Sequence, residues 1–164
     1  MPVAKKIITN SPEETREVAS KFAEQILQNK SRLQSNQRYS TKSGLGRKAV
    51  VLALKGNLGA GKTTFLQGFA KGLGIEEKVL SPTFILMRRF DIQDLVYRNF
   101  YHIDCYRLKN EKDLDYLGFE EMLKNPENII AIEWPERIKK VLPKDISEIK
   151  FSYLQGNKRK LEVR

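Results

Sequence analysis

The sequence has 164 residues, a length that favours one folded domain with a hydrophobic core of its own. Apolar residues make up 40% of it and charged residues 30%, as in globular proteins. No run approaches the roughly 18 consecutive apolar residues of a membrane span, and the first residues show no apolar secretory signal. We therefore expect no membrane segment. The single cysteine, Cys105, excludes an intramolecular disulfide and is consistent with a reducing compartment.

The formal net charge of +10 favours a polyanionic partner, and RNA is the first candidate. A cationic surface that keeps the protein in solution explains the same excess. Charge alone does not separate these two interpretations.

The N-terminal region predicts a short strand at Ile7 and Ile8 and then a helix. Ser11 is suited to the N-cap, Pro12 to the first helical position and Glu14 to a capping box. Apolar residues at helical spacing continue the helix to about Gln28.

Residues 29–48 are basic and polar, and contain no acidic residue. Their composition predicts a long polar insertion in the single domain 1–164. Two interpretations stay open for it: a solvated flexible loop, or a basic arm that binds a partner.

An apolar run at 49–54 (AVVLAL) predicts a strand buried on both faces, as in a parallel sheet. A glycine-rich loop follows at 56–61, and apolar residues at helical spacing begin after Lys62. Gly72 and Gly74 supply the stop for this helix.

The second half of the chain predicts mostly strands. Residues 83–90 and 95–103 form a hairpin around a turn at 91–94, and a second hairpin joins 146–153 to 161–163. Residues 113–123 read as a helix and 128–132 as a short buried strand. The predicted fold class is α/β, a P-loop NTPase-like mixed sheet flanked by helices in a single domain.

The loop GNLGAGKT at 56–63 matches the phosphate-binding pattern G-x-x-x-x-G-K-[ST]. Its glycines let backbone N–H groups point at phosphate oxygens, and the following helix presents its N-terminus to the anion. Lys62 is suited to the β- and γ-phosphates and Thr63 to Mg²⁺. The expected nucleotide-binding residues here are Asn57, Leu58, Gly59, Ala60, Gly61, Lys62, Thr63 and Thr64.

A triphosphate site also needs acidic residues near the metal. Asp104 and Glu133 each end a predicted strand, where a carboxylate can hold Mg²⁺ or orient an attacking water. From position alone, a cap or surface role is equally open for both. His102, the single histidine, and Trp134 are read from the residues alone as structural.

Several blocks together resemble one family. They are GNLGAGKTTF at 56–65, SPTF at 81–84, FYHIDCYRL at 100–108, LGFEEML at 117–123 and EWPERI at 133–138. Their order and spacing are similar to those of the TsaE (YjeE) family, bacterial ATPases of tRNA threonylcarbamoyladenosine biosynthesis. The similarity is close over about residues 50–143.

The resemblance implies a cytoplasmic, Mg²⁺-dependent ATPase, slow alone, that acts on the TsaB–TsaD complex between turnovers. That complex transfers a threonylcarbamoyl group, made by TsaC, to the adenosine beside the anticodon. By resemblance Asp104 is the metal-associated acid, Glu133 and Trp134 form a functional pair, and Thr83 lies in a switch-like loop near the γ-phosphate. Lys62, Asp104 and Glu133 are then the expected catalytic residues, and Thr63, Asp104 and Glu133 the expected metal residues. Thr83 and Trp134 join the loop residues as expected nucleotide-binding residues.

One departure from the family stands in the loop, where Asn57 replaces the usual aspartate. Two other functions are weighed. A small-molecule P-loop kinase would need an arginine-bearing lid, for which Arg88, Arg89 and Arg107 are available. A non-catalytic RNA-binding module would bind tRNA without nucleotide dependence.

Overall fold

The computed structural model describes residues 5–36 and 48–164. The elements in chain order are β1 (Lys5–Thr9), α1 (Pro12–Asn36), β2 (Val50–Lys55), α2 (Lys62–Gly72), β3 (Met87–Asp91), β4 (Asn99–Asp104), the 3₁₀ helix η1 (Glu111–Leu117), α3 (Phe119–Lys124), β5 (Asn128–Glu133), the 3₁₀ helix η2 (Pro135–Ile138), β6 (Ser147–Tyr153) and β7 (Arg159–Val163). The chain is therefore the α/β domain that the sequence predicts.

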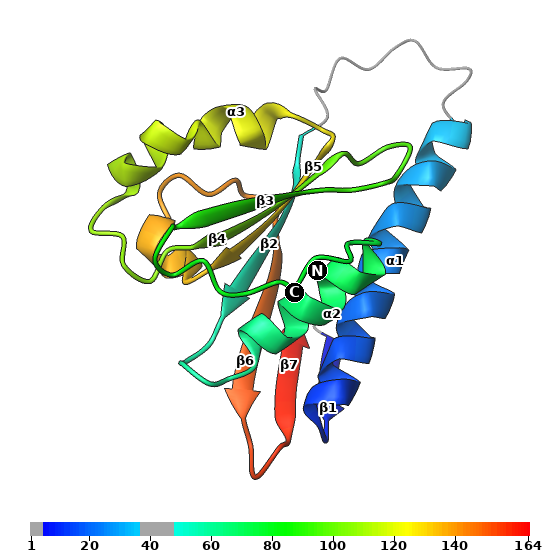
Figure 1. The fold of residues 1–164 in the computed structure, drawn as a ribbon, viewed down its shortest axis with the longest axis vertical. Helices are drawn as coiled ribbons and strands as arrows, with labels where there is room; N and C mark the ends of the chain where they lie inside the picture. The colour runs from blue at the N-terminus through cyan, green and yellow to red at the C-terminus, as the bar shows by residue number, and fades with distance from the viewer. Residues whose placement is uncertain (1–4, 37–47) are drawn as a thin grey trace.

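These strands form one mixed sheet of seven in the order β1-β7-β6-β2-β5-β4-β3 (Figure 1). The strand before the glycine loop, β2, is central and runs parallel to both β5 and β6. β4 is parallel to β5, whereas the β3–β4, β6–β7 and β1–β7 pairs are antiparallel. The two predicted hairpins and the mixed sheet are confirmed.

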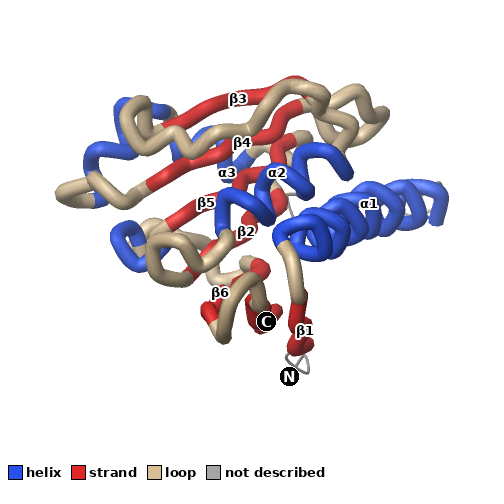
Figure 2. Tube along the Cα trace, turned by 60° about the horizontal axis from the view of Figure 1, so that its bottom comes forward, coloured by secondary structure: helices blue, strands red, loops and turns tan. Residues whose placement is uncertain are grey.

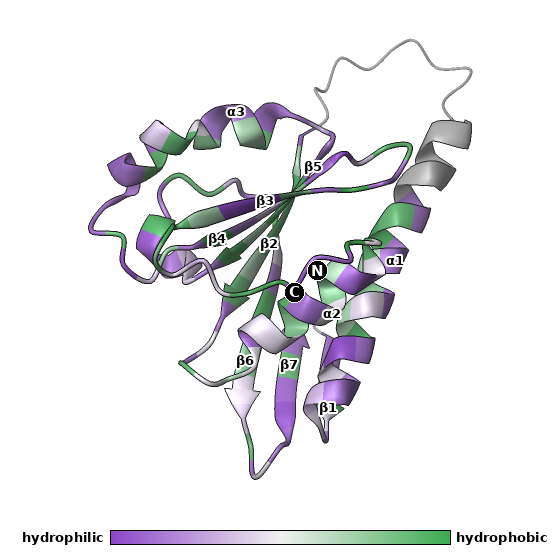
Figure 3. Cartoon of the chain, in the orientation of Figure 1, coloured by the Kyte–Doolittle hydropathy of each residue, from purple (hydrophilic) through white to green (hydrophobic). Residues whose placement is uncertain are grey.

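Helices cover both faces of the central strands. Leu52 and Leu54 of β2 face the core under α1 and α2, which lie side by side (Figure 2). Val51 faces the opposite core, which η1 and α3 close with side chains such as Leu114 and Phe119. A strand with both faces covered needs apolar residues at every position, which explains the unbroken run in β2. Figure 3 shows β2 largely green and β7, near the sheet edge, mostly purple.

Two glycines of α2 allow it to lie very close to α1. A Cβ atom on Gly68 would lie 2.2 Å from the Arg16 carbonyl oxygen, and one on Gly72 would lie 2.4 Å from that of Ser20. Gly72 thus serves packing as well as the helix end. Gly74, with a φ of +78°, supplies the left-handed residue that follows the helix.

The first helix is longer than predicted, because α1 continues to Asn36 instead of ending near Gln28. The prediction of a loop beginning at residue 29 is therefore wrong over 29–36. This stretch contains Lys, Arg, Leu and Gln, all good helix formers, and no glycine or proline. The remainder of the predicted insertion, 37–47, lies outside the described residues.

The β3–β4 hairpin is shorter than predicted, and its loop is longer. β3 starts at Met87 because the Pro82 carbonyl oxygen accepts bonds from the N–H groups of Ile85 and Leu86, which form turns. β4 starts at Asn99 because the Asp94 carboxylate accepts N–H bonds from residues 96 and 97.

The helix predicted at 113–123 is divided into two elements. Gly118, with a φ of +67°, separates η1 from α3. An L-residue rarely takes this backbone conformation, so a regular helix ends there. Over the described residues, no helix is long and apolar enough to cross a membrane.

We predict that Gly68→Ala destabilises the protein by about 1–3 kcal/mol, because the new methyl group must push α2 away from the α1 backbone. Urea unfolding measures this loss. Lys71→Ala, an exposed change on the same helix, is the control and should stay within about 0.5 kcal/mol of the wild type. Equal stabilities for the two variants would contradict the close packing.

Candidate functional site

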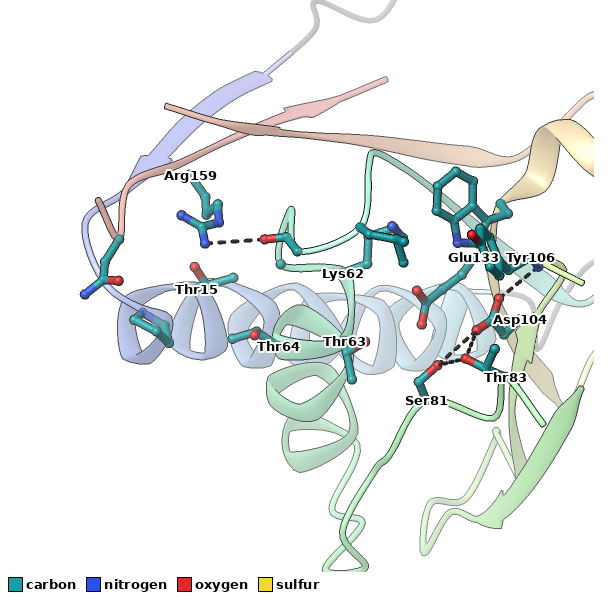
Figure 4. Close-up of a pocket in the computed structure, with 16 residues that line it drawn as sticks. Thr15, Lys62, Thr63, Thr64, Ser81, Thr83, Asp104, Tyr106, Glu133 and Arg159 are labelled. Carbon is teal, nitrogen blue, oxygen red and sulfur yellow. Dashed lines mark hydrogen bonds between the residues drawn. The ribbon is translucent and has the colours of Figure 1, made fainter. Parts of the chain in front are cut away.

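The candidate site lies at one edge of the sheet, where parallel strands end together. Leu54 of β2 is in register with Glu133 of β5, and Glu133 is in register with Asp104 of β4. The carboxyl ends of these strands, the glycine loop and the start of α2 surround a cavity of about 390 Å³ (Figure 4). Such an edge is where open α/β sheets bind their ligands.

The glycine loop takes backbone conformations that other residues rarely adopt. The φ angles are +148° at Gly56, +76° at Gly59 and +102° at Gly61. A Cβ atom on Gly56 would also lie 2.8 Å from the Phe151 carbonyl oxygen of β6. Among residues 5–36 and 48–164, no side chain caps the N-terminus of α2, so its first N–H groups and the helix dipole are left for an anion in the cavity.

Lys62 is buried at the base of this loop, with 5% of its surface exposed. Its Nζ donates to the carbonyl oxygens of Gly56, at 2.6 Å, and Asn57, at 3.1 Å. Burial lowers the pKa of Lys62, and the nearby carboxylates of Glu133 and Asp104 oppose that shift. An ammonium has three donors, so a donor beyond the two loop bonds is left for a ligand oxygen.

Asp104 connects the cavity to the loop that precedes β3. Its Oδ2 accepts bonds from the hydroxyls of Ser81, at 2.9 Å, and Thr83, at 2.6 Å (Figure 4). Its Oδ1 accepts the N–H of Tyr106 at 3.0 Å. The carboxylate is buried and both of its oxygens accept bonds, so a ligand that takes Oδ2 must compete with two hydroxyls.

Glu133 is held by a buried histidine. His102 lies two residues before Asp104 on the same face of β4, and its Nε2 is 2.8 Å from Oε1 of Glu133. Nε2 must carry the proton, since a carboxylate only accepts. The other ring nitrogen, Nδ1, is buried and has no partner among the described residues. The structural role predicted for His102 is thus a specific one: it orients Glu133.

Trp134 closes the site above Lys62. Its backbone is left-handed, with a φ of +57°, a conformation that costs energy for a bulky residue and is found at functional sites. It brings the indole ring to within 4.5 Å of the Lys62 Nζ and 5.1 Å of the Tyr106 ring. The ring face attracts the ammonium and shields it from water.

The cavity brings together most of the predicted site residues. Those that line it are Leu58, Gly59, Gly61, Lys62, Thr63, Thr64, Thr83, Asp104, Glu133 and Trp134. Asn57 and Ala60 line a neighbouring depression beside Phe151 and Tyr153 instead. Asn57 still contributes its backbone oxygen to Lys62.

Sequence reasoning missed a second wall of the cavity, formed by the two ends of the chain. Pro12 and Thr15 begin α1, and Asn157 and Arg159 lie at the β6–β7 turn. Arg159 Nη2 donates to the Gly59 carbonyl oxygen at 3.4 Å (Figure 4). No local motif marks these residues, because strand pairing brings them to the loop: β6 beside β2 places the β6–β7 turn there, and β1 beside β7 places the start of α1 there.

The arginines considered for a kinase lid do not line the cavity. Arg88 and Arg89 lie on β3, at the sheet edge, and pair with Glu77 and Asp91. Arg107 lies over the Phe84 ring, at 4.5 Å. Burial raises the pKa of the Cys105 thiol to about 12, so this cysteine is not a nucleophile near neutral pH.

We predict that His102→Leu lowers the free energy of unfolding by about 1–3 kcal/mol, because it leaves the buried Glu133 carboxylate without its donor. His102→Gln keeps an N–H donor on a side chain of similar length and should lose less.

The measurement is a double-mutant cycle in urea with Glu133→Gln. A coupling energy well above about 0.5 kcal/mol supports the contact. Additive losses would show that His102 acts independently of Glu133.

The chain is similar to known proteins in both its sequence and its fold. Residues 9–161 match the family model of the threonylcarbamoyl adenosine biosynthesis protein TsaE. The Rickettsia typhi protein named tRNA threonylcarbamoyladenosine biosynthesis protein TsaE is 37% identical over 115 residues, 70% of this chain and 76% of the relative. Its namesake in Rickettsia felis is 33% identical over 93% of this chain and 75% of its own.

A crystal structure of Bacillus subtilis YdiB superposes with a TM-score of 0.68 and 26% identity, covering 99% of this chain and 87% of that one. The family match, the relatives and the shared fold agree with the resemblance carried by the sequence blocks. The chain belongs to the TsaE family of tRNA threonylcarbamoyladenosine biosynthesis.

Proposed function

We propose that this protein is a Mg²⁺-dependent ATPase that serves tRNA threonylcarbamoyladenosine formation in the cytoplasm. One observation carries the ATPase proposal: a buried lysine inside a glycine loop faces two buried carboxylates across a single cavity. A cavity with this charge pattern suits a polyphosphate together with its cation.

The residues present fit Mg²⁺. The Thr63 hydroxyl and the Asp104 and Glu133 carboxylates line the cavity and are the hard oxygen donors that this ion prefers. Within the described residues, no three histidine, cysteine or acidic side chains form a closed metal cage. That accords with a Mg²⁺ site completed by phosphate oxygens and water. When bound, the ion neutralises charge on the phosphates.

The chain's own groups would then act on the phosphates as follows. Loop N–H groups and the Lys62 ammonium stabilise charge that develops on the transferred phosphoryl group. Glu133, held by His102, orients the attacking water. Trp134 keeps bulk water away from the lysine. We place the nucleoside end of ATP against the second wall, between the start of α1 and the β6–β7 turn.

Turnover by the protein alone is expected to be slow. Arg159 lines the cavity but is bonded to loop and turn carbonyls, and the other arginines considered above point elsewhere. A partner is therefore expected to complete or rearrange the site. We propose the TsaB–TsaD complex as this partner, reset between turnovers by ATP hydrolysis, with tRNA contacted indirectly or through the basic segment 29–48.

The test is Lys62→Ala in multiple-turnover threonylcarbamoylation of tRNA by purified TsaB, TsaD and TsaC, with phosphate release followed in the same reactions. Loss of the ammonium should reduce phosphate release by about 10²–10³-fold and restrict modification to the first turnover.

Lys71→Ala, which removes an exposed lysine from the same helix, should behave as wild type. If Lys62→Ala leaves both modification and phosphate release unchanged, the proposed function is refuted. Lost phosphate release with normal modification would leave an ATPase but remove it from this pathway.

A further inference from the structure

The segment between α2 and β3 carries three apolar side chains that are exposed to solvent. Between α2 and β3, Leu80, Phe84 and Ile85 are 50%, 85% and 62% exposed. We call these three residues the apolar loop patch. Exposed apolar side chains gathered within six residues of one segment are a feature of contact surfaces.

The patch is presented by an ordered backbone. Pro82 is buried, and its carbonyl oxygen accepts the N–H groups of Ile85, at 3.0 Å, and Leu86, at 2.7 Å. The Leu86 carbonyl oxygen in turn accepts the N–H of Asp104 at 2.9 Å. The turns hold Phe84 outward, which favours recognition because little order must be gained on binding.

The same segment is tied to the candidate ATP site. Ser81 and Thr83, on either side of Pro82, both donate to Oδ2 of Asp104. Asp104 lines the cavity together with Lys62 and Thr63. A ligand that recruits Oδ2 would compete with these two hydroxyls. The candidate site and the segment that presents Phe84 therefore share one carboxylate.

The charge beside the patch defines the partner's chemistry. The Arg107 guanidinium lies 4.5 Å from the Phe84 ring centroid and is exposed. Within the described residues, no carboxylate pairs with Arg107, so its charge is left for a partner. Together with the net charge of +10, this favours a protein surface with an apolar pocket bordered by carboxylates.

We propose that the apolar loop patch and Arg107 form a docking surface for an acid-rimmed apolar groove of a partner protein, with an affinity set by the nucleotide. The phenyl ring of Phe84 enters the groove, and Arg107 pairs with its rim. The proposal rests on the proposed function in one respect, because the TsaB–TsaD complex is the probe.

The experiment titrates the full-length protein against purified TsaB–TsaD, with Mg²⁺ and a non-hydrolysable ATP analogue. Phe84→Ser should weaken binding at least about 10-fold, since buried aromatic anchors dominate interfaces. Leu95→Ser and Tyr116→Ser are matched controls, because these side chains are 92% and 93% exposed and lie outside the patch. Both should bind within about twofold of wild type.

Arg107→Glu should weaken binding further as salt is lowered, because repulsion from the acidic rim is then less screened. All variants should keep the wild-type affinity for the nucleotide, measured separately. A Phe84→Ser variant that binds as tightly as wild type would overturn the docking surface.

A separate comparison tests whether the nucleotide sets the affinity for TsaB–TsaD. Wild type should bind TsaB–TsaD with affinities that differ at least about fivefold between the ATP analogue and ADP. In a Ser81→Ala, Thr83→Val variant, which lacks both hydroxyls, that ratio should approach one. An unchanged ratio would overturn the link through Asp104.

Failure of the docking proposal can be told apart from failure of the proposed function. If wild type does not bind TsaB–TsaD in any nucleotide state, both are wrong. If wild type binds and supports modification while Phe84→Ser does the same, only the docking surface is wrong.

Discussion

Three charged side chains, Lys62, Asp104 and Glu133, are buried at one edge of the sheet, each with at most 5% of its surface exposed. Burying a charge is unfavourable unless partners compensate it. Here the lysine is bonded to loop carbonyls, and each carboxylate has its own donors in the chain. The wrapped glycine loop, the histidine in β4 and the strained backbone at Trp134 all serve to maintain these partners.

The topology explains why the charges meet. β2, β4 and β5 are parallel and end at the same edge, so Asp104 and Glu133, the last residues of β4 and β5, and the loop that follows β2 reach one cavity. β6 is parallel to β2 as well, and β1 pairs with β7. The β6–β7 turn and the start of α1 therefore reach the same edge from the far side of the loop. Residues near the two ends of the sequence therefore complete a site whose charged side chains come from the middle of the sequence.

Much of this site was predictable, because several of its residues are neighbours in the sequence. The glycine loop, Lys62 and Thr63 are encoded in one short motif between a buried strand and a helix. Asp104 and Glu133 could be chosen as candidates because each ends a predicted strand. That they lie close together depends on the order of the strands in the sheet, which hydrophobic periodicity does not reveal. Arg159 and Thr15 could not be predicted, because their approach to the loop depends on the pairing of β2 with β6 and of β1 with β7, and the second pair joins residues at least 150 positions apart.

The errors in predicted boundaries have similar causes. Residues 29–36 are polar, and composition suggested a loop, yet α1 continues through them, a stretch that contains good helix formers and no glycine or proline. Residues 83–86 are apolar and β-prone, yet the turns at Pro82 and the bonds to Asp104 hold them out of the sheet. In the second case hydrogen bonds at the candidate site override local preference. The same bonds place exposed Phe84 beside the candidate site.

The most direct test of the central claim, that Lys62 and its loop hold a polyphosphate, is a calorimetric comparison of ATP, ADP and AMP binding in the presence of Mg²⁺. The loop and the ammonium are suited to the β- and γ-phosphates, so ATP and ADP should bind and AMP should bind at least about 100-fold more weakly. Lys62→Ala should remove most of that difference. Equal affinities for all three nucleotides, or a difference that survives the loss of Lys62, would contradict the account.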